Sequence, residues 1–267
     1  MSTLAYTVSD STVMLRRNLR RLQRYPSMTL LLIGLPIIFL LLFVYVFGGQ
    51  LGAGLGSGLA GGHTGRSGYL NYVTPGIVLM SVAAAVQGTA IVVAMDMTGG
   101  IIDRFRTMHI ARSSVLTGHV LASLIQTLLS VGIIFGVAVA LGFRPTTDVV
   151  SWLGAIGMLA LFAFALIWLA TALGLAAKSV ETASNTPMFL TLLPFLGSGF
   201  VPTDTMPIGL RQFAAYQPFT PVTETVRGLL MGTSIGWNGV AAVAWSVGIA
   251  FASYLWARHL YNQRRAH

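Results

Sequence analysis

Six long apolar segments constrain the fold of this 267-residue chain more than any other feature. About 20 apolar residues cross a bilayer as an α-helix, because a lipid-exposed backbone must satisfy its own hydrogen bonds. The chain is 55% hydrophobic and only 9% charged, which is typical of a polytopic membrane protein and not of a soluble domain. We therefore expect an all-α membrane protein with six transmembrane helices. The predicted spans are Met28–Phe47, Val73–Met95, Leu116–Leu141, Trp152–Ala177, Pro187–Val201 and Trp237–Trp256.

The fifth predicted span is the weakest of the six. It is short, and Pro194 and Gly197 interrupt it. In the proline-rich region that follows, Ile208–Tyr216 and Val222–Met231 each begin just after a proline, as helices often do. We expect two short helices there that form an outer cap or a re-entrant hairpin between the last two spans. A plain loop is the alternative.

The basic residues are unevenly divided between the two sides that these spans define. With the N-terminus in the cytoplasm, twelve of the sixteen lie in cytoplasmic segments and four in outer ones. Cytoplasmic loops of membrane proteins carry the excess of Lys and Arg, so we expect both termini in the cytoplasm and an even number of spans. The twelve are Arg16, Arg17, Arg20, Arg21, Arg24, Arg104, Arg106, Arg112, Lys178, Arg258, Arg264 and Arg265, and the four are Arg66, Arg144, Arg211 and Arg227.

We expect a single transmembrane domain over residues 1–267, with the six-span bundle over 28–257 and a cytoplasmic tail over 258–267. Residues 1–27 are polar and Arg-rich and precede a full-length apolar run, so they are not expected to be a cleavable signal. Leucines at helical spacing among five arginines predict an amphipathic helix on the inner leaflet, and a charged stop for insertion explains them equally well. The net charge of +9 therefore indicates contact with lipid and not with nucleic acid. Gly48 to Gly68 contains ten glycines and is expected to be a flexible outer loop.

The sequence contains no recognisable catalytic or metal-binding pattern. The chain has no cysteine, which excludes disulfides and thiolate-bound metals. Its one lysine, Lys178, lacks the glycine spacing of a phosphate-binding loop, and its five histidines show no His-Glu-x-x-His spacing. Small residues at helix contacts explain Gly197-Ser198-Gly199 better than an intramembrane serine hydrolase does. We expect no enzymatic activity in this chain.

Ionisable residues are nearly absent from the spans, whereas ion-coupled secondary transporters usually carry them there. Asp96, at the inner end of the second span, suits a loop-anchoring role better than a proton relay. The composition therefore favours a path that tolerates bulky apolar cargo. The polar residues of the spans suit helix–helix hydrogen bonds or the lining of such a path, and Glu224 and Arg227 are spaced to pair on one helix. The candidate residues for the path or its gate are Gln87, Thr89, Asn185, Thr186, Pro202, Pro207, Glu224 and Arg227.

A short charged segment separates the second and third predicted spans. Gly100-Ile101-Ile102-Asp103-Arg104-Phe105-Arg106 combines apolar residues at helical spacing with three charges. A charged helical turn at the cytoplasmic mouth of a membrane bundle suits contact with a soluble partner. The residues expected to couple the chain to that partner are Gly100, Asp103, Arg104, Phe105 and Arg106.

Taken together, these features resemble the permease subunit of a type-two ABC exporter, and most closely the daunorubicin-resistance branch of actinobacteria. The resemblance covers essentially the whole chain. One departure is His109, which follows Met108 where the family often has proline; it would lengthen the coupling helix or alter the choice of partner. The motifs that carry the resemblance are Thr74-Pro75-Gly76, Asp103-Arg104-Phe105-Arg106, Phe200-Val201-Pro202 through Met206-Pro207, Gln217-Pro218, Pro221, and Glu224 with Arg227.

The resemblance implies a homodimer or paired half-transporter driven by two copies of a separate ATP-binding subunit. That subunit would bind ATP and magnesium, and no cofactor is expected in this chain. Its closure would push on the helix at Gly100–Ile110 and reorient the spans, with the outer re-entrant helices acting as a gate. The resemblance also implies a multi-pass protein of the bacterial cytoplasmic membrane. Its cargo would be a lipophilic or amphipathic drug or antibiotic, with a lipid or a cell-envelope glycan as the alternative.

Overall fold

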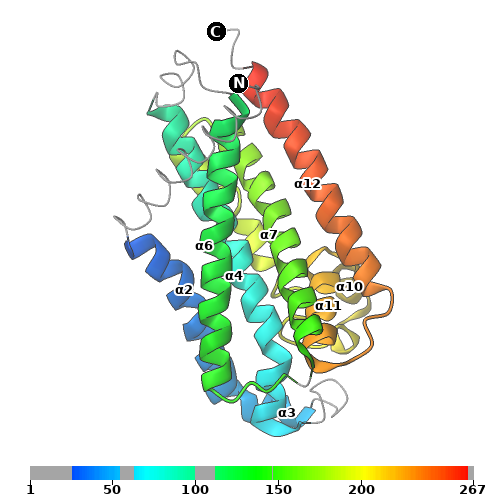
Figure 1. The fold of residues 1–267 in the computed structure, drawn as a ribbon. Helices are drawn as coiled ribbons and strands as arrows, with labels where there is room; N and C mark the ends of the chain where they lie inside the picture. Colours follow the sequence, from blue (N-terminus) through cyan, green and yellow to red (C-terminus); the bar gives the residue numbers. More distant parts are fainter. Residues whose placement is uncertain (1–25, 55–62, 100–111, 146, 264–267) are drawn as a thin grey trace.

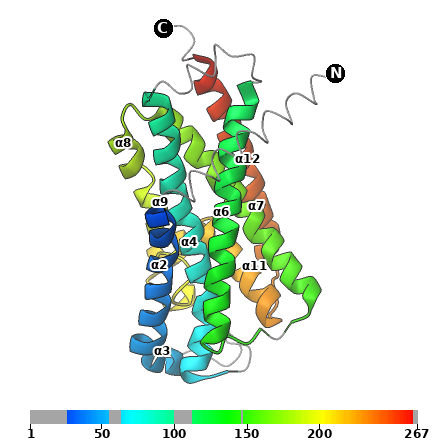
Figure 2. The ribbon, with the colours of Figure 1, turned by 60° about the vertical axis from the view of Figure 1, so that its left-hand side comes forward.

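The computed structural model describes residues 26–54, 63–99, 112–145 and 147–263. Within these ranges every regular element is helical, and the long helices lie side by side along one axis (Figures 1 and 2). The elements are α2 (Pro26–Leu41), a π-helical turn (Leu42–Phe47), α3 (Gly48–Gly54), α4 (Gly65–Thr98), α6 (Arg112–Ala140), α7 (Val149–Ala176), α8 (Val180–Asn185), α9 (Met188–Leu192), a 3₁₀ turn (Thr203–Thr205), α10 (Ile208–Tyr216), α11 (Phe219–Met231) and α12 (Asn238–Gln263).

Among the described residues, five helical segments are long and apolar enough to cross a membrane. Each overlaps one of the predicted spans, so five of the six expected segments are continuous helices. The exception is Pro187–Val201, which contains only the short α9 followed by turns up to Phe200. The five spanning segments are Ile33–Gly54, Gly65–Thr98, Thr117–Ala140, Val149–Ala176 and Asn238–Tyr261.

The chain still returns from one end of the bundle to the other between α7 and α12. Both helices run upward in Figure 1 and pack against each other. The connection from Ala177 to Trp237 therefore descends from the upper end, past α8 and α9, to α10 and α11 in the lower half (Figures 1 and 2). The predicted helix Ile208–Tyr216 has the expected bounds, whereas α11 begins at Phe219, three residues before the predicted Val222.

Helix α4 is the central helix of the bundle. Its apolar window is 72% buried, against 22% for the windows of α2 and α12, and it packs against α2, α6, α7, α8 and α11. With 34 residues it is about 51 Å long, whereas the hydrocarbon core of a bilayer is about 30 Å thick. The main core surrounds it, with Ile77, Phe162 and Phe219 among its fully buried side chains.

Part of the expected glycine-rich loop is helical. Residues 48–54 form α3, and α4 begins within the same predicted loop at Gly65. A Cβ atom on Gly52 would lie 2.0 Å from the carbonyl oxygen of Gly65, so the two backbones meet at a contact that only glycine permits. Composition suggested flexibility there, but the glycines allow two helix ends to pack closely.

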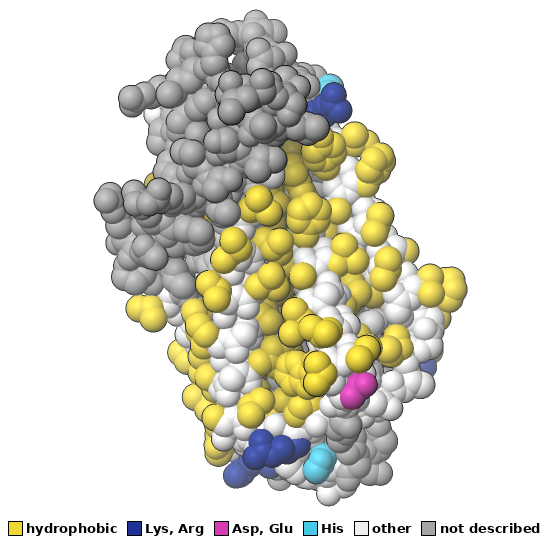
Figure 3. Space-filling model, in the orientation of Figure 1, with side chains coloured by type: hydrophobic (Ala, Val, Ile, Leu, Met, Phe, Trp, Pro, Cys, Tyr) yellow, Lys and Arg dark blue, Asp and Glu magenta, His cyan; other side chains and the backbone are white. Residues whose placement is uncertain are grey.

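The exposed surface matches a chain surrounded by lipid. Figure 3 shows hydrophobic side chains over the middle of one face and basic side chains near its upper and lower ends. Large apolar residues such as Leu129, Leu153 and Phe251 are 63–64% exposed on α6, α7 and α12. Apolar surface of this extent on several long helices is expected of a multi-pass membrane protein.

Candidate functional site

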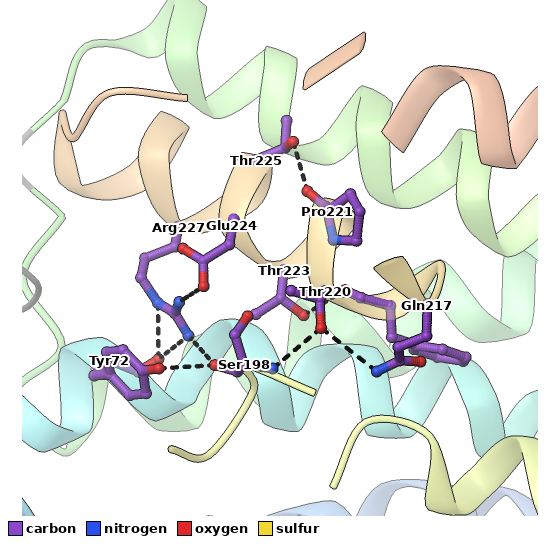
Figure 4. A network of polar contacts seen from close by, with 10 residues as sticks. Tyr72, Ser198, Gln217, Thr220, Pro221, Thr223, Glu224, Thr225 and Arg227 are labelled. Atoms are coloured by element: carbon purple, nitrogen blue, oxygen red, sulfur yellow. Dashed lines mark hydrogen bonds and ion pairs between the residues drawn. The ribbon is translucent and has the colours of Figure 1, made fainter. Parts of the chain in front are cut away.

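The interrupted fifth predicted span, Pro187–Val201, is called the broken segment below. Helix α4 contacts it backbone to backbone, through Gly76 of α4 and Gly199 of the broken segment. A Cβ atom on Gly76 would lie 2.3 Å from the carbonyl oxygen of Gly199, so no other residue fits there without displacing the backbone. This contact places residues 197–200 against α4, opposite the start of α11. We refer to the region as the α4–α11 junction; it comprises Tyr69, Tyr72, residues 193–200, Gln217, Thr220, Glu224 and Arg227. Figure 4 shows its part around Tyr72, Ser198 and Arg227.

Arg227 of α11 lies at the centre of this junction and is 1% exposed. Its Nη2 donates to the carbonyl oxygens of Ser198 at 2.8 Å and Tyr72 at 3.1 Å, and its Nε donates to the same Tyr72 oxygen at 3.3 Å. Its Nη1 pairs with Glu224 Oε1 at 2.5 Å, so the predicted i,i+3 ion pair is present (Figure 4). The buried positive charge is thereby paired and hydrogen-bonded, as burial of a charge requires.

Two tyrosines of α4 also form hydrogen bonds with the backbone of the broken segment. The hydroxyl of Tyr72 donates to the carbonyl oxygen of Ser198 at 3.0 Å, and that of Tyr69 donates to the carbonyl oxygen of Phe200 at 3.1 Å. Both side chains are only 1% exposed. Since a buried tyrosine hydroxyl needs a partner, these contacts satisfy the side chains and the backbone together.

The first turn of α11 and Gln217, two residues before that helix, complete the junction. Gln217 Nε2 donates to the carbonyl oxygen of Leu193 at 2.9 Å, and the main-chain N–H of Ser198 donates to Thr220 Oγ1 at 3.2 Å. A Cβ atom on Gly197 would lie 2.4 Å from Nε2 of Gln217, so the glutamine side chain packs directly on the glycine.

The junction therefore replaces the hydrogen bonds that a continuous helix would make. Irregular backbone at membrane depth is tolerated only where protein or a water-filled cavity satisfies its polar groups. Here the carbonyl oxygens of Leu193, Ser198 and Phe200 accept hydrogen bonds from side chains of α4 and α11 and from Gln217. Chemically, the arrangement clamps three chain segments together and leaves the Glu224 carboxylate 28% exposed.

The structure separates the predicted path residues into two groups. Gln87 of α4 donates to the carbonyl oxygen and hydroxyl of Ser184 in α8, at 3.0 and 3.3 Å, whereas buried Thr89 donates to Ala85 of its own helix. Asn185 and Thr186, at the end of α8, are exposed. None of these four residues belongs to the α4–α11 junction.

The predicted gate residues lie closer to the junction. Glu224 and Arg227 belong to it, as described above. Pro202 is the residue immediately before the 3₁₀ turn, and Pro207 is the residue immediately before α10. Helix α10 is largely exposed and is held by the surface ion pair between Arg211 and Asp204, at 2.6 Å.

The predicted coupling residues Gly100, Asp103, Arg104, Phe105 and Arg106 lie outside the described residues. Helix α4 ends at Thr98 before this segment, and α6 begins at Arg112 after it. In Figure 1 the end of α4, the start of α6 and the end of α12 all lie at the upper end of the bundle.

At the lower end, Asp148 begins α7 as an N-cap and accepts a hydrogen bond from the Ser151 main chain at 3.1 Å. The hydrogen bonds from Ser151 hold the pKa of the Asp148 carboxyl below its ordinary value. Within the described ranges, no group of three or more His, Asp or Glu side chains could hold a metal ion.

Sequence reasoning missed the tyrosines and Thr220 of the junction. Gln217 was noticed only as part of a motif, and Ser198 only as an unconvincing nucleophile. A signal was available: Tyr69 and Tyr72 lie just before the predicted span Val73–Met95 and its Thr74-Pro75-Gly76 motif, and a tyrosine hydroxyl buried beside an apolar span needs an acceptor.

These features define a polytopic helical membrane protein with one broken segment clamped to a central helix. Residues 10–231 match the family described as ABC-2 type transporter, and the chain belongs to that family. An ABC transporter works with an ATP-binding partner, so this chain is the permease component of such a transporter.

Two relatives agree with this assignment. The daunorubicin resistance ABC transporter permease protein DrrB1 of Streptomyces coeruleorubidus is 26% identical over 264 residues, which cover 98% of this chain and 89% of the relative. The probable doxorubicin resistance ABC transporter permease protein DrrC of Mycobacterium tuberculosis is 25% identical over 175 residues, or 64% of this chain and 63% of the relative.

Proposed function

We propose that this chain forms the membrane path of an ATP-driven exporter that moves a lipophilic or amphipathic drug-like compound out of a bacterial cell. The observation that carries the proposal is the similarity over 98% of the chain to a permease named for daunorubicin resistance. The character of the spans supports it, because their ionisable side chains lie only near the ends. Within the five spanning segments, the Arg, Lys, His, Asp and Glu residues are Arg66, Asp96, His119, Arg258 and His259.

In this proposal the chain itself is not catalytic. Two copies of a separate ATP-binding subunit bind ATP and magnesium, and a second permease copy completes the path as a homodimer. The family supports an ATP-binding partner, and the sequence supports the division of labour because it lacks a phosphate-binding loop. The predicted coupling segment around Arg104 is the part of the chain that would receive the partner.

The proposed topology has six crossings, with both termini in the cytoplasm. Its support is that α7 and α12 run in the same direction, so the connection between them crosses back as a broken fifth span (Figure 1). The upper end of the bundle in Figure 1 is then the cytoplasmic side. The twelve-to-four division of basic residues favours the same orientation.

Helices α10 and α11 are proposed as the outer re-entrant pair that forms the gate. The junction fixes α11 to α4 through Arg227, whereas α10 is exposed and joined to its surroundings by few polar contacts among the described residues. We place the path on the face that includes Gln87 and the end of α8. Exposed Asn185 and Thr186 lie there beside exposed Phe189, a mixture suited to amphipathic cargo.

The test is export in cells and in vesicles. The chain is expressed with the ATP-binding subunit of its transporter in a drug-sensitive bacterium, and daunorubicin accumulation is measured with and without the permease. We expect lower accumulation and higher resistance when both subunits are present. Unchanged daunorubicin accumulation, together with retention of a lipid or polar glycan precursor in a strain lacking the permease, would instead assign the exporter to lipid or glycan cargo.

A further inference from the structure

Asp96 and His119 form a buried pair at the end of the bundle where α4 and α6 meet the connector between them. His119 Nε2 lies 3.2 Å from Asp96 Oδ2, and the two side chains are 4% and 2% exposed. Asp96 is two residues before the end of the α4 span, and His119 is two residues after the start of the α6 span. The pair therefore joins the two helices at matching depths.

Stability alone is a weak reason for this pair. Removing a carboxyl group and an imidazole from water offsets most of what their contact contributes, and apolar side chains of similar volume are often as stabilising. Asp96 also lies in the last turn of α4, where the partial negative charge of a helix C-terminus disfavours a carboxylate. What the pair supplies, and apolar packing does not, is a directional contact that fixes the end of one helix against the other.

The surroundings of the pair form a separate packed unit. A second hydrophobic cluster lies at this end of the bundle, apart from the main core. At this cluster α4 and α7 touch closely, because a Cβ atom on Gly174 of α7 would lie 2.9 Å from the Cβ of Val93 in α4. The cluster consists of Val93, Val120, Ile167, Trp168, Ala172, Leu175, Ala257 and Tyr261, which come from α4, α6, α7 and α12.

We propose that Asp96 and His119 are positioning residues, which hold the ends of α4 and α6 together so that a force on the connector moves both helices as one unit. This rests on the proposed function, in which the ATP-binding subunit acts on that connector. When the contact between Asp96 and His119 is removed, the ATP-binding subunit still docks and hydrolyses ATP. Part of the movement that it imposes on the connector then separates the ends of α4 and α6 and does not move the two helices together. Transport per ATP hydrolysed then falls.

The first measurement needs no cargo. Because the natural chain has no cysteine, spin labels can be attached to cysteines introduced at Met95 and Ile125, which are 40% and 36% exposed on α4 and α6. The labelled permease is diluted with unlabelled permease and assembled with its ATP-binding subunits in lipid. The distance between the two labels is then measured by double electron–electron resonance spectroscopy. We expect Asp96→Asn to broaden the α4–α6 distance distribution. Glu181→Gln, which alters an exposed carboxylate on α8, is the matched control and leaves it unchanged.

The second measurement is daunorubicin transport per ATP hydrolysed in vesicles that contain the intact transporter. We expect Asp96→Asn to lower this ratio about tenfold, a typical size for a coupling between sites, while ATP hydrolysis and copurification of the ATP-binding subunit are retained. The exchange variant Asp96→His with His119→Asp restores the ratio, which a general packing defect would not allow. If Asp96→Asn does not accumulate in the membrane, His119→Gln serves in both measurements.

An unchanged distance distribution, or an unchanged transport ratio, would overturn the positioning role. Failure of the wild-type transporter to move daunorubicin would contradict the proposed cargo instead. In that case the distance measurement alone decides the role of the pair.

Discussion

The guanidinium of Arg227 lies over the ring of Tyr72, with Cζ 3.8 Å from the ring centroid, and also donates two hydrogen bonds to the main-chain carbonyl of that tyrosine. One side chain of α11 thus holds both the side chain and the backbone of a residue in α4. This combination needs a planar group with several fixed donors, which arginine has and lysine lacks. The first prediction follows from this difference.

Replacing Arg227 by lysine keeps the charge beside Glu224 but removes the fork that reaches Ser198 and Tyr72. We expect Arg227→Lys to lower the free energy of unfolding by about 2 kcal/mol, because hydrogen bonds to a charged group are lost in a buried site. The measurement is thermal unfolding of the detergent-solubilised permease. Arg211→Lys, at an exposed ion pair, is the control and should stay within about 0.5 kcal/mol of wild type. Equal stability of the two variants would show that the junction does not depend on the guanidinium.

The contact between Gly76 and Gly199 gives the second prediction. A methyl group at position 76 would meet the carbonyl of residue 199 at 2.3 Å, so Gly76→Ala must push the broken segment away from α4. We expect a loss of about 1–3 kcal/mol, as for other overpacked cores, measured by the same thermal unfolding.

The control for this substitution lies on the same helix. A Cβ atom on Gly88 would have nothing within 4 Å, and alanine is a better helix former than glycine. Gly88→Ala should therefore leave the stability unchanged or raise it. A wild-type melting temperature in Gly76→Ala would contradict the close packing at the junction.

The positions of five spans could be predicted because apolar length is a local property of the sequence, although some of their ends differ from the predicted ones by up to eight residues. Helix α10 was predicted at its observed bounds for a similar reason, since Pro207 marks its start. The clamping of residues 193–200 could not be predicted in this way. Pro194 and Gly197 indicate a break, but the groups that satisfy the broken backbone include Tyr69 and Tyr72, which lie more than 120 residues earlier in the chain.

In the glycine-rich region after the first span, the sequence predicted less regular structure than the chain has. Ten glycines suggested a flexible loop, yet Gly52 packs against Gly65 and helices extend into the region from both sides. A high glycine content indicates that a backbone can adopt many conformations. It does not indicate whether a second backbone packs against the glycine at a distance that any side chain would prevent. For the same reason, the pairing of Asp96 with His119 depends on how α4 and α6 pack and not on any local motif.

The proposed topology can be tested with single cysteines, because the natural chain has none. We expect a membrane-impermeant maleimide to label Arg144→Cys and Ser234→Cys in intact cells. Lys178→Cys should be labelled only after permeabilisation. All three positions are exposed and lie in connections at helix ends. Labelling of Lys178→Cys in intact cells, or protection of either other position, would show that the proposed six crossings are wrong.

The purified permease should not hydrolyse ATP without its partner. The sequence lacks the glycine-rich loop that cradles nucleotide phosphates, and its one lysine is not placed to replace that loop. ATPase turnover is measured on permease purified with and without the ATP-binding subunit. We expect turnover only in the complex, and turnover that persists after every copurifying protein is removed would contradict the division of labour proposed above.

The last prediction concerns Arg104 in the connector between α4 and α6. A glutamate at this position would repel the acidic groups of the ATP-binding subunit that the arginine contacts. Loss of a buried charged contact at an interface costs about 2–5 kcal/mol. We expect Arg104→Glu to insert normally in the membrane but to uncouple daunorubicin transport from ATP hydrolysis. Arg258→Glu reverses an exposed basic residue of α12 at the same end of the bundle and should transport normally. Copurification of the ATP-binding subunit and transport are measured side by side for both variants. Wild-type values for Arg104→Glu in both assays would remove this residue from the coupling contact.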